Sequence, residues 1–334
     1  MNDSGERYEK HLLWSNTTLV STEKLITVIT PYFNNCNLFR TIESVLRQSY
    51  PNIEYIIADD GSINTDTNIK CIEGLLKQDL LKNFSSIQVI QQHQNVGTVR
   101  NLNAAIKESR GEYIFILSAD DMFVNDSVLS KWKSFMEQNN ALVSTAKRVI
   151  CKDSIANIQC IRPTRRQIHN IDRLRPKELY TKMAYENLII GCCTAYQKDC
   201  FLQYGYFDKN YILLEDHPKA LELLKNDVRI FFWDELAIYY MDDGVSGVVS
   251  QNTVFEQDVE RLLKEEAIYQ GHDENAIVLK HRERKERLIQ FYKAWNSKKL
   301  VKAFSIYPKQ AIKEILKPFR SMLIKTYLLI WKNV

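Results

Sequence analysis

The sequence predicts an α/β protein with a central, mostly parallel sheet, followed by a helical C-terminal segment. Between Leu25 and Asp121, short apolar runs alternate with stretches whose apolar residues recur at helical spacing. This alternation is typical of βαβ units with right-handed crossovers, which build a parallel sheet. Hydrophobic residues make up 45% and charged residues 26% of the chain, as in ordinary folded globular proteins.

The expected elements follow one another in order. Short runs rich in β-branched residues predict buried strands, and these are residues 25–30, 53–58, 87–90 and 113–117. Asn34 and Asn35 are both suitable helix caps, and the apolar residues after them are spaced i, i+3, i+4, i+7. The predicted helices are residues 38–46, 69–81 and 99–109.

The chain is expected to have three parts. Residues 1–22 form an N-terminal extension, residues 23–250 form the main domain, and residues 251–334 form a helical segment with a basic amphipathic tail. Seven irregularly spaced cysteines, without a CxxC pair, indicate reduced thiols and not disulfides or zinc ligands. The polar N-terminus lacks the apolar stretch of a secretory signal, which indicates a cytoplasmic protein.

Polar clusters follow three of the predicted strands. These are Pro31-Tyr32-Phe33-Asn34, Asp59-Asp60-Gly61-Ser62 and Ser118-Ala119-Asp120-Asp121. In an open parallel sheet, ligands bind beyond the carboxyl ends of the strands. We therefore expect the three clusters to converge on one site.

The carboxylates in these clusters allow more than one interpretation. Asp120 and Asp121 directly follow an apolar strand, where a cation such as Mg²⁺ or Mn²⁺ would compensate their charge. The alternative is the start of a helix, because Asn125 or Asp126 can begin one soon afterwards. Asp60 can accept hydrogen bonds from a nucleobase or a ribose, or the cluster around it can simply be a turn.

Taken together, these motifs resemble glycosyltransferase family 2 in order and spacing. The resemblance runs from Leu25 to Ser246 and includes Asn95-Val96-Gly97 with Arg100 before a helix. It implies the GT-A fold, with a donor-binding half in residues 23–122 and an acceptor half in residues 123–250. It also implies inverting transfer of a sugar from a nucleotide-sugar donor, with a UDP-sugar as the first expectation.

The resemblance assigns roles to individual residues. The donor nucleotide would be bound by Pro31, Phe33, Asn34, Asp60, Arg100 and Asp120. Asp121 and Asp120 would hold Mn²⁺ or Mg²⁺. Many family members have Asp where this chain has Ser118, so the metal site depends on Asp120 and Asp121 alone.

The second half of the chain resembles the acceptor side of the family. Glu215-Asp216-His217 looks like the family's acidic motif, which makes Asp216 the general base. Glu215, His217, Gly191 and Cys192 are expected at the acceptor or sugar pocket. Two alternatives stay open: Glu215 and Asp216 can be the acidic start of a helix before Pro218, and His217 can hydrogen-bond to a neighbour.

The tail differs in composition from the rest of the chain. From residue 291 onwards there are ten Lys and Arg and one acid, Glu314. Apolar residues recur at helical spacing between them, at Ile312, Ile315, Leu316, Phe319, Met322, Leu323, Tyr327, Ile330 and Trp331. Pro318 is expected to kink this helix or to start a second one. The tail can lie on an anionic membrane or pack on the body, and its lack of acids favours the membrane.

These features predict the partners. The resemblance implies a saccharide or lipid-linked saccharide acceptor, as in bacterial surface-polysaccharide assembly at the inner face of the cell membrane. No nucleic-acid-binding motif accompanies the basic tail, and nothing in the sequence indicates an oligomeric state. Two rival functions are a non-catalytic nucleotide-sugar-binding partner of another transferase and a sugar-phosphate nucleotidyltransferase. The second would need a Gly-rich phosphate loop where Pro31 to Asn35 stand.

Overall fold

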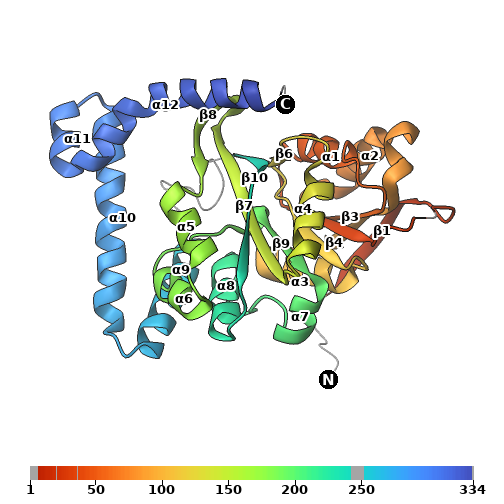
Figure 1. The fold of residues 1–334 in the computed structure, drawn as a ribbon, viewed down its shortest axis with the longest axis horizontal. Helices are drawn as coiled ribbons and strands as arrows, with labels where there is room; N and C mark the ends of the chain where they lie inside the picture. The colour runs from red at the N-terminus through yellow and green to blue at the C-terminus, as the bar shows by residue number, and fades with distance from the viewer. Residues whose placement is uncertain (1–6, 20, 36, 242–251, 333–334) are drawn as a thin grey trace. The chain divides into compact units, whose positions relative to one another are not determined.

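The computed structural model describes residues 7–19, 21–35, 37–241 and 252–332, and of residues 327 and 329–332 it describes the backbone alone. This part of the chain divides into two compact units (Figure 1). One unit comprises Met1–Arg148 and Pro163–Tyr240, and the other comprises Val149–Arg162 and Met241–Val334. All the predicted site residues belong to the first unit.

The strands form one mixed sheet in the order β1-β4-β3-β2-β5-β9-β7-β10-β6, with β8 paired to β7. Their bounds are Tyr8–Ser15 (β1), Ile26–Tyr32 (β2), Ile53–Asp59 (β3), Phe84–Gln92 (β4), Tyr113–Ile116 (β5), Met122–Phe123 (β6), Val143–Lys152 (β7), Ser154–Arg162 (β8), Thr194–Gln197 (β9) and Ile230–Met241 (β10). The predicted strands are confirmed as β2, β3, β4 and β5.

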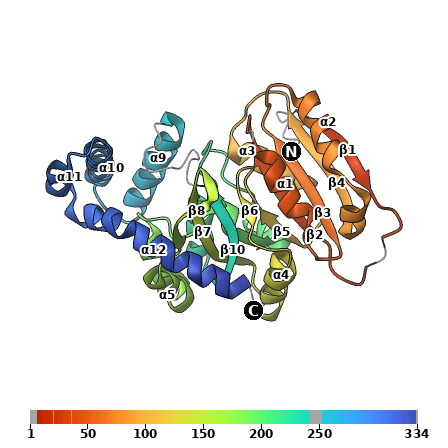
Figure 2. The ribbon, with the colours of Figure 1, turned by 90° about the horizontal axis from the view of Figure 1, so that it is seen from above.

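The centre of the sheet is parallel, because β4, β3, β2 and β5 all run in the same direction. The chain passes from β2 outward to β3 and β4 and then returns to place β5 on the other side of β2, so the strand order reverses between β2 and β5. Such a reversal opens a crevice at the carboxyl ends of the strands. Figure 2 shows β2, β3, β4 and β1 side by side.

The outer strands were not predicted. Strand β1, within the presumed N-terminal extension, pairs antiparallel with β4. On the other side, β9 pairs antiparallel with both β5 and β7. The short strand β6 pairs antiparallel with β10. The first residues of the chain thus complete the edge of the sheet.

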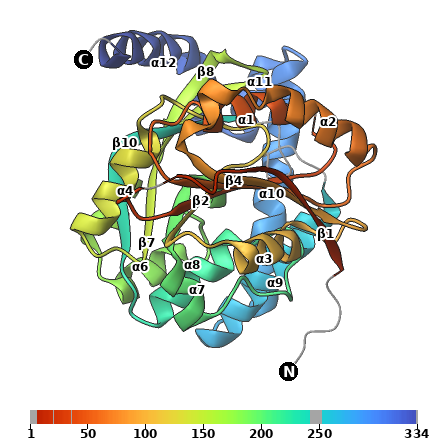
Figure 3. The same ribbon diagram turned by 90° about the vertical axis from the view of Figure 1, so that its right-hand side faces the viewer.

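Helices cover both faces of the parallel strands. Their bounds are Leu38–Leu46 (α1), Thr65–Leu75 (α2) and Thr98–Glu108 (α3), with a 3₁₀ turn, η1, at Gln78–Asn83. Helices α1 and α2 lie on one face and α3 lies on the other (Figure 3). Helix α1 buries Leu38, Ile42 and Val45, the residues whose spacing predicted it.

One helix cap and the bounds of one helix were predicted wrongly. Asn37 caps α1, whereas Asn34 has a left-handed backbone with φ of 49° and Asn35 accepts a bond from the N–H of Asn37. The helix expected over residues 69–81 begins earlier, at Thr65, and ends at Leu75. Leu81 belongs instead to η1.

The remaining helices of the first unit surround the second half of the sheet. They are Val128–Gln138 (α4), Arg165–Arg173 (α5), Pro176–Met183 (α6), Lys198–Tyr204 (α7) and Asp216–Lys225 (α8), with a 3₁₀ turn, η2, at Gly191–Cys193. Helix α4 is capped by Ser127, not by Asn125 or Asp126. It contributes Trp132 to the core, stacked on Trp233 at 5.3 Å between ring centroids.

The second unit is mostly helical. Its helices are Thr253–Tyr269 (α9), Glu274–Asn296 (α10), Leu300–Ile306 (α11) and Pro308–Lys332 (α12). Phe291, Ala294, Ala303 and Ala311 form its buried cluster. Helix α12 packs beside β8 and runs through Pro318, so no second helix starts there (Figure 1). Within the described residues, no helix is both long and apolar enough to cross a membrane.

A buried carboxylate joins the amino-terminal ends of the parallel strands. Glu54, the second residue of β3, is fully buried and accepts bonds from the hydroxyl of Thr27 and the backbone N–H of Arg110, both at 2.7 Å. The Arg110 side chain also donates to Glu54 at 2.7 Å, and through a second nitrogen it donates to Ser86 of β4. Thr27 in turn accepts a bond from the N–H of Gly111, just before β5.

We expect Glu54→Ala to lower the free energy of unfolding by about 3 kcal/mol, because its donors would stay buried without an acceptor. Glu112→Ala is the matched control, since Glu112 makes an exposed ion pair with Lys24 and should cost less than about 1 kcal/mol. Urea unfolding of the two variants measures both values. Equal losses would show that Glu54 is not what holds these strand ends.

Candidate active site

Asp60 follows β3 and fastens the loop before α3. Its two carboxylate oxygens accept the N–H groups of Val96 at 2.8 Å and Gly97 at 3.1 Å. The residue is 5% exposed, and burial raises the pKa of its carboxyl to about 6. The Asp59–Ser62 cluster and the motif Asn95-Val96-Gly97, which belongs to the family resemblance, are therefore in direct contact.

Glycines make this contact possible. Gly61 has φ of 74°, and a Cβ there would lie 2.5 Å from the carbonyl carbon of Gln94. Gly97 has φ of 86°, and its Cβ would lie 2.6 Å from the carbonyl oxygen of Ile212. Both positions need glycine, because other residues rarely adopt this backbone and would collide with the neighbouring main chain.

The residues after β2 meet the same loop. Asn34 donates its N–H to the Ser62 hydroxyl and accepts the N–H of Ile63, both at 2.8 Å. Phe33 is 47% exposed beside it, and Pro31 lies opposite Ala58 of β3. Arg100, in the first turn of α3, is exposed and makes no hydrogen bond or ion pair with the residues that the structure describes.

Asp59 supports the turn interpretation of this cluster. Its carboxylate accepts the N–H of Ser62 at 2.9 Å and the hydroxyl of Thr65 at 2.7 Å. It is fully buried. Asp59 therefore shapes the turn that presents Asp60 and does not itself face a ligand.

Asp120 and Asp121 differ in their exposure. Asp121 is fully buried, its N–H donates to the Ser118 carbonyl at 3.0 Å, and its own carbonyl accepts the Thr41 hydroxyl at 2.7 Å. Asp120 is only half-buried. The Asp121 side chain faces the Cys192 thiol. Burial, together with this nearby carboxylate, raises the pKa of Cys192.

The donor set fits a cation only in part. Among the described residues, no group of three or more His, Cys, Asp or Glu side chains could hold a metal ion. Mg²⁺ is commonly bound by one or two carboxylates, with water and substrate phosphates completing its shell. Asp120 has the open side that such a shell needs, whereas Asp121 is enclosed by protein.

Asp216 is buried on the other side of the turn η2. It is 6% exposed, and it accepts the N–H of Gly191 at 2.9 Å and that of His217 at 2.6 Å. Burial raises the pKa of its carboxyl. Asp216 is also the first residue of α8, with Glu215 at the N-cap position, so the helix-start interpretation is correct.

Gly191 lies close against Glu215, and the ring of His217 binds a neighbouring main-chain carbonyl. A Cβ on Gly191 would lie 2.3 Å from a carboxylate oxygen of Glu215. His217 is 7% exposed, and its Nε2 lies 2.6 Å from the Met183 carbonyl. Since a carbonyl can only accept, Nε2 carries a proton there. The structure therefore shows His217 in a hydrogen bond to a neighbour.

The turn η2 connects the predicted metal side to the predicted base. Gly191 contacts Asp216 through its N–H, and the next residue, Cys192, faces Asp121. Strand β5 and η2 are also in contact. The sequence after β10 contains Asp242 and Asp243, for which it allows either a simple turn or a loop that closes over the donor, and these residues lie outside the described part of the chain.

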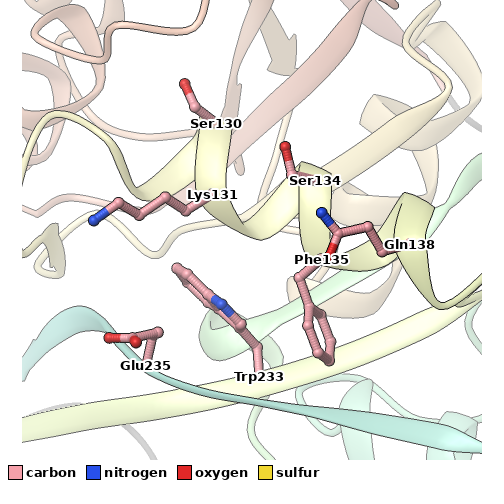
Figure 4. A pocket seen from close by; sticks show the side chains of 7 residues that line it. All are labelled: Ser130, Lys131, Ser134, Phe135, Gln138, Trp233 and Glu235. Carbon is pink, nitrogen blue, oxygen red and sulfur yellow. The ribbon is translucent and has the colours of Figure 1, made fainter.

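A separate pocket of about 480 Å³ lies between α4 and β10 (Figure 4). Phe135 and Trp233 form its apolar sides, and Lys131 and Glu235 lie at its edge. It includes none of the residues predicted from the sequence. We therefore place the active site at the strand ends and not in this pocket.

Two residues near the site were not predicted. Thr41 of α1 holds the backbone of Asp121 through its hydroxyl. Arg148 of β7 lies near η2, because it lowers the thiol pKa of Cys193, which burial raises to about 12. A charged residue within an apolar strand was the signal for Arg148, and Thr41 gave none.

Comparisons with known proteins agree with this geometry. A family model described as Glycosyl transferase family 2 matches residues 27–205. An uncharacterized glycosyltransferase of Haemophilus influenzae is 34% identical over 128 residues, which cover 38% of this chain and 48% of that protein. The putative teichuronic acid biosynthesis glycosyltransferase TuaG of Bacillus subtilis is 29% identical over 177 residues, covering 53% of this chain and 63% of TuaG. The matches thus span about half of one relative and less than two thirds of the other.

Solved structures share the fold. Staphylococcus aureus TarS in complex with UDP-GlcNAc superimposes with a TM-score of 0.55 at 18% identity, covering 84% of this chain and 72% of that one. The mannosyltransferase PcManGT of Pyrobaculum calidifontis, in complex with GDP-Man and Mn²⁺, gives 0.50 at 15% identity, covering 91% and 79%. The family model covers more than half of the 334 residues, and its motifs lie at the strand ends. The chain therefore belongs to glycosyltransferase family 2 and has the GT-A fold.

Proposed function

We propose that the protein is an inverting glycosyltransferase that moves a sugar from a nucleotide-sugar donor to a hydroxyl of a saccharide or lipid-linked saccharide. The observation that carries this proposal is that η2 links Asp216 on one side to Asp121 on the other. An inverting transfer needs a base on one face of the reacting carbon. On the other face, something must compensate the negative charge that develops on the leaving diphosphate.

Asp216 is the proposed base. The carboxylate takes the proton of the acceptor hydroxyl as its oxygen attacks the anomeric carbon, and the bond from that carbon to the diphosphate breaks. Burial raises the pKa of Asp216, which makes the carboxylate a stronger base than an exposed one. The N–H groups of Gly191 and His217 fix its orientation.

The donor is proposed to lie at the ends of β2, β3 and β5. Phe33 offers an exposed ring for a nucleobase, and Asp60 keeps the loop at residues 95–97 in place beside it. Asp120 would hold Mn²⁺ or Mg²⁺, which when bound stabilises negative charge on the leaving diphosphate. The buried Asp121 is proposed to position this segment, and the Thr41 hydroxyl holds the backbone carbonyl of Asp121 by a hydrogen bond.

The names of similar proteins support the substrate class. TarS was solved with UDP-GlcNAc, and TuaG is named for teichuronic acid biosynthesis. PcManGT was solved with GDP-Man, so the fold alone does not select the nucleotide. On this basis we propose a UDP-sugar as donor and an acceptor from bacterial surface-polysaccharide assembly.

Helix α12 is proposed to bind the inner face of the cell membrane. An apolar stripe of this helix is exposed although the helix packs beside β8, and it consists of Ile312, Ile315, Leu316, Phe319, Met322 and Leu323. Lys313, Lys317 and Arg320 flank the stripe, which suits anionic lipid. Tyr327, Ile330 and Trp331 continue the pattern, but their side chains lie outside the described residues.

A non-catalytic donor-binding partner is the remaining alternative from another functional class. The oriented, buried Asp216 favours an enzyme, because a carboxylate buried at such cost has no use in donor binding alone. Hydrolysis of a UDP-sugar by the purified protein separates the two. The family membership leaves no support for a sugar-phosphate nucleotidyltransferase.

We expect Asp120→Asn to remove the Mn²⁺-dependent part of UDP binding and to leave the melting temperature unchanged. Asp121→Asn should weaken the same binding and also lower the melting temperature, because Asp121 is enclosed by protein. Calorimetric titration of UDP with and without Mn²⁺ measures the first effect. Asp126→Asn, an exposed neighbour, is the control. If Asp120→Asn binds UDP with the same Mn²⁺-dependent affinity as the wild type, Asp120 does not bind the cation.

Asp216→Asn should lower kcat by about 100-fold or more with nearly unchanged donor affinity. In the wild type, kcat should rise with pH as Asp216 loses its proton, and this limb should vanish in the variant. Asp60, with a pKa of about 6, should affect the KM for the donor instead. Glu222→Gln, on the outer side of the same helix, is the control. A variant with wild-type kcat would mean that another group is the base.

We expect the double change Phe319→Glu and Leu323→Glu to abolish binding to anionic vesicles, because both side chains are exposed on the stripe, at 64% and 66%. Each Lys or Arg near an anionic leaflet contributes about 1 kcal/mol, so salt should weaken wild-type binding. The control changes Leu300 and Val301, exposed apolar residues of α11, to Glu. Co-sedimentation measures binding. If both double variants pellet with the vesicles to the same extent, the apolar stripe of α12 does not contact the membrane.

A further inference from the structure

Two of the three guanidinium nitrogens of Arg148 are buried without a hydrogen-bond partner. Arg148 lies in the middle of β7 and is itself half-buried, and its Nε and Nη1 atoms are inaccessible to water and make no hydrogen bond with any residue that the structure describes. Its guanidinium lies 5.6 Å from the ring centroid of Tyr240, at the end of β10. The preceding residue, Lys147, is by contrast fully engaged with Asp234.

The surroundings of Arg148 belong to the active site. The Cys193 thiol of η2 lies 3.4 Å from the Ala146 carbonyl and 3.7 Å from the Lys147 carbonyl, so η2 packs on β7 directly beside Arg148. Cys192, the neighbouring residue, faces Asp121, and Gly191 binds Asp216. Arg148 therefore lies beside the turn η2, and η2 contacts both the proposed base and the proposed metal side.

Buried guanidinium nitrogens without an acceptor are costly unless something else binds them. Burying a charged donor without an acceptor destabilises the folded protein. The fork of N–H groups on arginine matches the oxygens of a phosphate better than any other common ligand. Aromatic contact with Tyr240 orients the fork but supplies no acceptor for its N–H groups.

We propose that Arg148 binds a phosphate group of a substrate in the active site. The proposal rests on the glycosyltransferase function, which supplies two sources of such a group. One source is the diphosphate of the donor, on the side of Asp121. The other is a phosphate carried by the acceptor, on the side of Asp216. Both give the same chemistry, and experiment distinguishes them.

The test compares Arg148→Met and Arg148→Lys with Lys147→Met. Lys147→Met is matched, because it removes one positive charge from the adjacent residue of the same strand, where the charge is already paired. Melting temperatures of the free proteins come first. Arg148→Met should melt at or above the wild-type temperature, because it removes two buried N–H-bearing nitrogens that have no acceptor. A clear decrease would indicate a merely structural role and would overturn the proposal.

Calorimetry then measures two probes. Pyrophosphate with Mn²⁺ represents the donor, and glycerol 3-phosphate added to protein saturated with UDP represents a phosphate on the acceptor. Arg148→Met should lose about tenfold or more in affinity for one probe, and Arg148→Lys should lose less, because it keeps the charge without the fork. The probe affected identifies the source. Lys147→Met should bind both probes like the wild type.

Two results would overturn the site. Either the wild type binds neither probe, or Arg148→Met binds both within about twofold of the wild type. Failure of the proposed function looks different: Arg148-dependent phosphate binding would persist while the wild type transferred and hydrolysed no sugar from any nucleotide donor. The two hypotheses can therefore fail separately.

Discussion

The hydrogen bonds of Glu54 are the constraint on which the site depends. They join β2, β3, β4 and the start of β5 at their amino-terminal ends. In a parallel sheet, the register between neighbouring strands at their amino-terminal ends determines which residues lie next to one another at their carboxyl-terminal ends. Slippage by one residue would turn every side chain to the opposite face. The clusters after β2 and β3 can meet because Glu54 fixes where these strands begin.

A second constraint aligns the two halves of the site. The turn η2 is short, and it contacts both β5 and Asp216, the first residue of α8. Gly191 can have no side chain, since a Cβ would lie 2.3 Å from Glu215. The close approach allows its N–H to bind Asp216 at 2.9 Å. The proposed base, Asp216, is thus held by the same turn that contacts Asp121, and movement of η2 would displace both residues.

The sequence predicted the parallel strands well and their surroundings poorly. Strands such as β3 are buried on both faces, so their apolar runs stand out without any knowledge of tertiary structure. Strand β1 mixes exposed and half-buried residues, because it covers the edge beside β4, and its pattern carries no comparable signal. The site, too, could be predicted only in part. The motifs at the strand ends were recognisable in the sequence. The hydrogen bonds that Asp60 accepts from Val96 and Gly97 were not, because they join residues more than thirty positions apart. Only the folded chain reveals such contacts.

The charges of the site also differ in what compensates them. The carboxylates of Asp60 and Asp216 are buried, but each is met by two backbone N–H groups, which lower the cost of keeping it ionised. These bonds are present before any substrate arrives, so neither carboxylate has to reorganise during the reaction. Within the described chain, Nε and Nη1 of Arg148 have no acceptor, and the Tyr240 ring supplies none. A folded protein retains buried donors without acceptors only at the expense of stability, and active sites are where that expense is usually found. The two acids have hydrogen-bond partners and two nitrogens of Arg148 have none, and this difference is the reason for assigning a ligand to Arg148.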